Sequence, residues 1–159
     1  MQKNSVTKIF EIAPKVFVTV GMGRGEFLDA VLDMCDVRER EICRGEFGKP
    51  YLRSGEVYFN LSHCEEVNVC VVAEDEVGVD VQKICWKPRV LKHACNAAEA
   101  AEIRTAEEFT RMWVLKESLV KCDGRGLAYG LKKIDTRNLK ESKVWRWGDF
   151  LIAACYNKG

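Results

Sequence analysis

Two carboxylates and a lysine, Asp80, Glu117 and Lys121, have the types and spacing of a magnesium and phosphate site. Valines at 77, 79 and 81 alternate with other residues, which predicts a strand with Asp80 and Gln82 on the face opposite the valines. Glu117 and Lys121 stand four residues apart in a helical pattern, so they lie one turn apart on the flank of its apolar stripe. Magnesium prefers a few carboxylates plus substrate phosphate oxygens, and a nearby ammonium would hold the remaining phosphate charge. Such residues are also often structural or solvated, so the pattern alone leaves both interpretations open.

Two polar turns and one buried-looking lysine add to this group. Asn60-Leu61-Ser62-His63 follows an apolar strand segment, which is typical either of turn chemistry or of a phosphate contact by His63. Ser62 lacks the glycines of a nucleophile elbow, so a hydrolase triad is poorly supported. Lys49, in the turn Gly48-Lys49-Pro50-Tyr51, lies beside an aromatic residue and suits a nucleotide contact. Lys116 falls in the middle of the apolar helix face, and we expect it to pair with a carboxylate within the site.

The spacing of apolar residues along the chain predicts the strands and helices that carry these side chains. Strands are predicted at 15–20, 57–61, 67–73 and 77–82, with one or two closing strands within 145–155. A helix is predicted at 27–35 with a polar extension to 44, and helical pattern runs from 88 to 121 with capping boxes at Asn96 and Thr105. This order predicts an α+β fold made of two related halves.

Composition bounds the class of protein. The chain has 159 residues, of which 47% are hydrophobic and 31% charged, so it suits one folded domain of ordinary size. The pattern lacks both a membrane-length apolar run and a secretory signal, which favours a cytoplasmic protein with no membrane partner. Eight scattered cysteines without a Cys-x-x-Cys pair are expected to be free thiols rather than a zinc site.

Charge is unevenly distributed along the chain. Residues 1–79 carry 9 basic and 14 acidic side chains, whereas residues 80–159 carry 16 basic and 10 acidic ones. The basic second part suits an anionic partner, which could be a nucleic acid, a phosphate ester or an acidic protein. No basic run with interleaved aromatic residues supports nucleic-acid binding, and we expect no such partner.

Five short blocks within residues 46–127 occur in an order that resembles the 4'-phosphopantetheinyl transferases, most closely the surfactin-synthetase-activating type. Each block is a weak motif alone, but five in the family's order at similar intervals are specific. The blocks are Gly48-Lys49-Pro50, Phe59-Asn60-Leu61-Ser62-His63, Gly78-Val79-Asp80-Val81, the run from Trp113 to Lys121, and Gly124-Arg125-Gly126-Leu127.

The resemblance implies transfer of the phosphopantetheine arm of coenzyme A to a serine of an acyl or peptidyl carrier protein, with magnesium (Mg2+) as cofactor. Adenosine 3',5'-bisphosphate would be released. Fatty-acid, polyketide and non-ribosomal peptide pathways all use such carriers. By position, Asp80 and Glu117 match the metal ligands, and Glu117 and Lys121 the catalytic pair. The implied coenzyme A contacts are Lys49, Ser62, His63, Lys116 and Lys121.

The chain also departs from the family pattern. The position two after the aspartate is commonly Glu and here is Gln82, which would bind the metal weakly or through water. We expect one transferase domain over 1–159, with a shortened first half at 1–76 and a second half at 77–159 that carries the metal site. The short first half has no clear match to the basic cluster that usually grips the 3'-phosphate. Gln82 and the short first half leave a second hypothesis open, a non-catalytic module that binds coenzyme A or a carrier protein.

Overall fold

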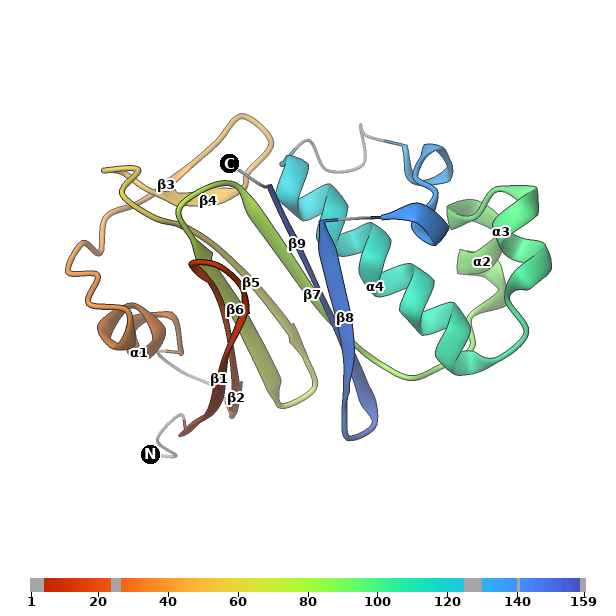
Figure 1. Cartoon of the computed structure of the whole chain (residues 1–159), viewed down its shortest axis with the longest axis horizontal. Coiled ribbons are helices and arrows are strands. Elements are labelled where there is room, and N and C mark those ends of the chain that lie inside the picture. Colours follow the sequence, from red (N-terminus) through yellow and green to blue (C-terminus); the bar gives the residue numbers. More distant parts are fainter. Residues whose placement is uncertain (1–4, 24–26, 125–129, 140, 158–159) are drawn as a thin grey trace.

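Four layers make up the molecule: a helix, two antiparallel sheets face to face, and a group of helices (Figure 1). The structure is a computed structural model that describes residues 5–23, 27–124, 130–139 and 141–157. The predicted block at Arg125, Gly126 and Leu127 lies outside the described residues. The mixed α+β class predicted from the sequence is confirmed.

The first sheet has four strands in the order β1-β2-β6-β5, and a small β3–β4 hairpin lies beside it. Helix α1 covers its outer face through a cluster that includes Phe27, Val31 and Phe59. The elements are β1 (Ser5–Ala13), β2 (Val16–Met22), α1 (Phe27–Met34), β3 (Ile42–Arg44), β4 (Pro50–Leu52), β5 (Tyr58–Cys64) and β6 (Val67–Ala73).

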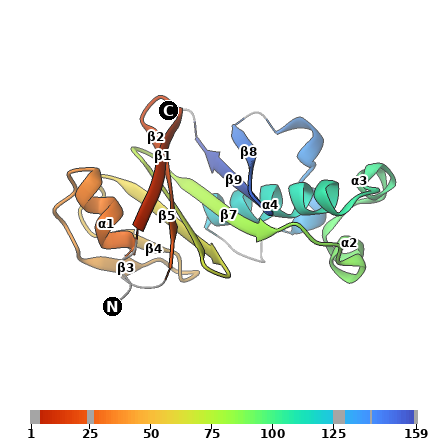
Figure 2. The same cartoon turned by 90° about the horizontal axis from the view of Figure 1, so that it is seen from below.

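The second sheet has three strands in the order β7-β9-β8, and the long helix α4 packs on its outer face. Two short helices lie beyond α4, at the far end of the molecule from α1 (Figures 1 and 2). The elements are β7 (Val77–Lys83), α2 (Pro88–Ala94), α3 (Ala97–Glu102), α4 (Ala106–Asp123), the short 3-10 helices η2 (Leu131–Lys133) and η3 (Thr136–Asn138), β8 (Ser142–Trp147) and β9 (Phe150–Tyr156).

The main core lies between the two sheets. The predicted alternation in β7 is confirmed, because Val77, Val79 and Val81 all point into this core and are at most 1% exposed. They meet valines of β2 and β6 that alternate in the same way. The opposite face of β7 therefore points toward α4, which places Asp80 between β7 and α4.

Both predicted capping boxes are present at the start of α3 and α4. The Asn96 side chain accepts from the backbone of Glu99, and Thr105 does the same with Glu108. All eight cysteines are free. No helix within the described ranges is long and apolar enough to cross a bilayer.

Three local predictions differ from the structure. The helix at 27–35 has no polar extension, because α1 ends at Met34 and residues 42–44 form strand β3. Asp36 adopts a φ of 55°, and the Val37 N–H then returns to the Leu32 carbonyl in a helix-ending turn. Strand β1 was not predicted. Strand β5 continues to Cys64, so Ser62 lies within the strand instead of after it.

A glycine permits the contact between β7 and α4. A Cβ atom at Gly78 would lie 2.0 Å from the Ser118 carbonyl oxygen and 2.4 Å from the Cys122 nitrogen. Both are backbone atoms, so neither can move without displacing the helix. This close approach brings the middle and the end of α4 next to Asp80.

We predict that Gly78→Ala lowers the free energy of unfolding by about 3 kcal/mol, because the methyl group must push α4 away from the sheet. Urea denaturation followed by circular dichroism measures the change. Gly45→Ala is the control, since its Cβ would meet only ordinary contact at 3.7 Å, and we expect a change within about 0.5 kcal/mol there. Equal stability of both variants would contradict the packing argument.

Candidate active site

The Asp80 carboxylate is enclosed by donors from three elements. Its side chain is 4% exposed. Ser62 Oγ donates to Asp80 Oδ1 at 3.0 Å, and Lys121 Nζ reaches the same oxygen at 3.2 Å. Gln82 Nε2 donates to Asp80 Oδ2 at 3.3 Å. Asp80 is therefore a buried, oriented carboxylate whose charge is matched by an ammonium.

Glu117 lies near this group in a different environment. Burial raises the pKa of Glu117, the charge on Asp80 raises it further, and Lys121 lowers it. Burial also raises the pKa of Asp80, while Lys121, Ser62 and Gln82 act in the opposite direction. Within the described ranges, no side chain donates a hydrogen bond to the Glu117 carboxylate. The two acids therefore form a like-charged pair that a cation would stabilise.

The donor set fits magnesium. Two carboxylates on rigid elements leave coordination positions for water and substrate phosphate, as magnesium prefers. Among the described residues, no group of three or more His, Cys, Asp or Glu side chains is arranged to hold a metal ion. A site of this kind would need a phosphate ligand to complete it.

Gln82 lies where the sequence placed it, on the same face as Asp80. Its amide nitrogen, rather than its amide oxygen, faces the aspartate. In this arrangement Gln82 acts as a donor to Asp80, whereas the glutamate expected at this position would add a second negative charge.

Lys121 and Lys49 both donate to the backbone of β7. Lys121 Nζ is 3.2 Å from the Val79 carbonyl oxygen, and Lys49 Nζ is 3.0 Å from that of Val77. Lys49 also pairs with Glu76 at 2.6 Å and reaches the Cys122 carbonyl oxygen at the end of α4. Glu76 was not singled out from the sequence, although its place directly before β7 puts it at the same strand end.

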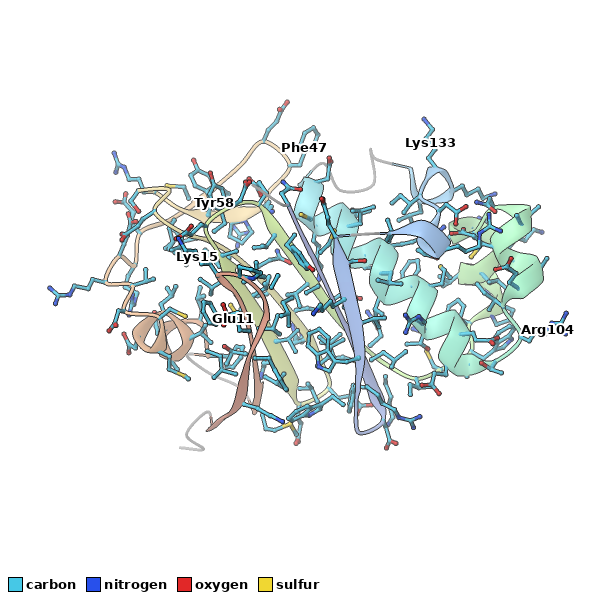
Figure 3. The ribbon with its side chains drawn as sticks, in the orientation of Figure 1. Glu11, Lys15, Phe47, Tyr58, Arg104 and Lys133 are labelled. Carbon is cyan, nitrogen blue, oxygen red and sulfur yellow. The ribbon has the colours of Figure 1, made fainter. Side chains whose placement is uncertain are left out.

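Two adjoining hollows lie beside these lysines. One, of about 290 Å³, is lined by residues of the β3–β4 loop, β5 and the end of α4, including Lys49 and Lys121. The other, of about 380 Å³, is lined by Lys49, Tyr51 and Tyr58 among others. Phe47 and Lys49 border both hollows, and Figure 3 shows Phe47 at the tip of the β3–β4 hairpin, near the end of α4. These sizes suit parts of a nucleotide-like ligand.

His63 is exposed and follows Ser62 directly in β5. Consecutive strand residues point to opposite faces, so His63 does not share the orientation of Ser62 toward Asp80. A ligand that touches both residues would have to pass around the edge of the strand.

The structure corrects the prediction for the partner of Lys116. It was expected to pair within the site, but its ammonium is fully buried and pairs with Glu99 at 2.6 Å. It also donates to the carbonyl oxygens of Ala94 and Leu131. Thr136 completes the arrangement by donating to the other Glu99 oxygen. Lys116 therefore joins α2, α3 and α4 to the 131–136 segment, away from Asp80.

Comparison with known proteins adds an independent observation. Residues 76–153 match the model of the 4'-phosphopantetheinyl transferase superfamily, and this range contains Asp80, Glu117 and Lys121. The chain belongs to that superfamily. The matched range spans β7 through α4 to most of β9, so it covers the second sheet and its helices.

Individual transferases match more of the chain at low identity. The chain is 26% identical to the 4'-phosphopantetheinyl transferase Sfp of Bacillus subtilis over 71% of its own length and 53% of Sfp. It is 28% identical to a putative 4'-phosphopantetheinyl transferase of Synechocystis over 74% of its length and 53% of that protein. It is 33% identical to the 4'-phosphopantetheinyl transferase AcpT of Salmonella typhi over 60% of its length and 55% of AcpT. This superfamily member thus spans about half the length of these relatives.

We predict that Glu117→Gln is more stable than the parent chain in metal-free buffer at neutral pH. Because the folded state raises the pKa of Glu117 above its ordinary value of 4.5, the folded protein binds this proton more tightly than the unfolded one. The parent chain therefore loses stability relative to the variant as pH rises from below 4.5, and keeps that deficit above the raised pKa. Urea denaturation between about pH 4 and 8 measures the difference.

Glu107→Gln serves as the control for this series, because Glu107 is exposed on the same helix and its ion pair with Arg146 lies at the surface. Its stability difference should be small and nearly constant with pH. A parent chain more stable than Glu117→Gln at every pH would contradict the expected repulsion at the carboxylate pair.

Proposed function

We propose that this chain transfers the 4'-phosphopantetheine arm of coenzyme A to a serine of an acyl or peptidyl carrier protein, in a Mg2+-dependent reaction. The observation that carries the proposal is the convergence of Asp80, Glu117 and Lys121 beside a hollow that Lys121 and Lys49 line. Membership of the transferase superfamily supports the same activity. The serine oxygen would bond to the β-phosphorus as the bond to the bridging oxygen breaks, which releases adenosine 3',5'-bisphosphate.

The proposed fold is that of the superfamily, two related α+β halves at 1–76 and 77–159 with coenzyme A between them. Each of the two main sheets is built from strands on one side of residue 76, which supports this division. The hollow of about 290 Å³ is lined from both sides of that boundary, by Lys49 and Leu61 on one side and Val120 and Lys121 on the other.

The proposed roles follow from the environments of the side chains. Asp80 and Glu117 would hold Mg2+, which supplies charge neutralisation at the transferring phosphate. Lys121 would face the pyrophosphate from beside Asp80, and Lys49, Ser62 and His63 would contact coenzyme A. Glu117 would accept the serine proton directly or through water.

A non-catalytic module that binds coenzyme A or a carrier protein is the second candidate. It is favoured by Gln82, whose neutral amide donates to Asp80 in place of a second metal-binding carboxylate. Incubation with coenzyme A, Mg2+ and a panel of apo carrier proteins separates the two hypotheses. A carrier that gains the mass of one phosphopantetheine supports the transferase, and binding without any mass gain supports the module.

We predict that Asp80→Asn slows this transfer by on the order of 10²-fold or more. The change removes a negative charge that would hold Mg2+, and Mg2+ would neutralise the reacting phosphates. Initial rates from intact-mass spectrometry measure the loss. The control is Asp149→Asn, the same change at an exposed residue in the β8–β9 turn, which should keep the parent rate. Similar rates for all three proteins would refute the role of Asp80.

We predict that Gln82→Glu tightens Mg2+ binding about tenfold in the absence of coenzyme A, because it adds a negative charge beside Asp80. Titration calorimetry measures the affinity. Lys83→Gln changes the net charge by the same amount at the next, exposed residue, and it should have little effect. Equal changes in both variants would mean that overall charge, and not the position of residue 82, sets the affinity.

A further inference from the structure

Asn60 is a buried polar residue that lines the hollow of about 290 Å³ and has no role among those proposed above. It lies in β5 and is 5% exposed. Its Oδ1 accepts a hydrogen bond from the Val79 N–H at 2.9 Å. A buried amide that lacks a partner is costly, so this contact is a strong constraint on the two strands that it joins.

The contact crosses between sheets. β5 pairs with β6 in the first sheet and β7 pairs with β9 in the second, yet β5 and β7 lie side by side (Figure 2). Two residues along, the Val81 N–H donates to Ser62 Oγ at 3.2 Å. The peptide N–H groups on both sides of Asp80 are thus held by side chains of β5.

Asn60 and Ser62 differ in one respect. The Ser62 hydroxyl also donates to the Asp80 carboxylate, whereas among the described residues the Asn60 oxygen accepts only from the backbone of β7. The Asn60 oxygen therefore influences Asp80 through the placement of the β7 backbone. Such placement matters, because an error of about 1 Å in a reacting group can cost about 10²-fold in rate.

We infer that Asn60 is a positioning residue, which fixes the backbone of β7 so that the Asp80 carboxylate meets Glu117 and Lys121 in the geometry that binds a divalent cation. This inference rests on the proposed function, since it assigns Asn60 to the same metal site. It names a residue whose amide oxygen acts on the metal site through the backbone of β7.

The test compares Asn60→Leu, which has a similar volume but no acceptor, with the parent chain. Mn2+ serves as the probe, and its affinity is measured by electron paramagnetic resonance without coenzyme A. We expect Mn2+ to bind about tenfold more weakly to the variant. Amide hydrogen exchange should also show faster exchange at Val79 in Asn60→Leu.

Val31→Ala is the matched control. Val31 is fully buried against the outer face of the first sheet, on α1, in a core cluster that contains no residue of β7. This variant should be less stable than the parent chain, yet keep the parent affinity for Mn2+ and the parent exchange rate at Val79. Asn60→Ala provides a second variant without an acceptor if Asn60→Leu does not fold.

The outcomes separate the inference from the function on which it rests. If the parent chain binds no Mn2+, the proposed metal site fails and the role of Asn60 with it. If the parent chain binds Mn2+ and the folded Asn60 variant binds it equally well, only the positioning role is overturned. An equal loss of affinity in Val31→Ala, or failure of both Asn60 variants to fold, would make Asn60 a purely structural residue.

Discussion

The edge of β7 that faces β5, away from β9, must have its peptide groups hydrogen-bonded, and the geometry of the site depends on how this is done. Among the described strands, β7 pairs with β9 alone, so the peptide groups along its other edge lack a neighbouring strand. Unpaired peptide groups in a protein interior are costly, and here side chains replace the missing strand. The side chains that hydrogen-bond to this edge belong to the sequence blocks that resemble the transferase family. The same side chains are therefore needed both for the stability of the fold and for the proposed chemistry. Asn60 and Ser62 accept from the N–H groups of Val79 and Val81, and Lys49 and Lys121 donate to the carbonyl oxygens of Val77 and Val79.

The second constraint comes from the face of β7 that packs against α4, opposite the face that carries the buried valines. Gly78 lets α4 approach until helix backbone and strand are in direct contact, and the next residue on that face is Asp80. A helix rises about 5.4 Å per turn, so residues one turn apart on α4 follow the strand at a similar spacing. Glu117 and Lys121 occupy such positions: Lys121 lowers the pKa of Asp80, and the charge of Asp80 raises the pKa of Glu117. Gly78 therefore sets the distance between α4 and β7, and the helical repeat determines which side chains of α4 lie beside Asp80.

The sequence predicted the features that depend on local periodicity, such as strands and helix caps. It did not predict contacts between residues that are far apart in the chain. Alternation in β7 and the capping boxes of α3 and α4 are local signals, and the structure contains them. The helical pattern placed Lys116 correctly on the buried face, but its partner Glu99 lies 17 residues away on another helix, and no period relates the two. Asp36 ends α1 by adopting a left-handed conformation, which a polar side chain tolerates without signalling it in the pattern. The grouping of Asp80 with Lys121 came from the resemblance as much as from spacing, because a strand and a helix far apart in the chain share no period.

The two carboxylates at the centre of the site differ in how their charge is compensated. Asp80 receives hydrogen bonds from Ser62, Gln82 and Lys121, so its orientation is fixed and these donors partly offset the burial that raises its pKa. Glu117 is partly buried on α4, and the nearby charge of Asp80 opposes its ionisation. A cation between the two acids would relieve that opposition at Glu117 more than at Asp80. The same asymmetry favours Glu117 over Asp80 for exchanging a proton, because Asp80 already accepts three hydrogen bonds, whereas among the described residues no side chain donates one to Glu117.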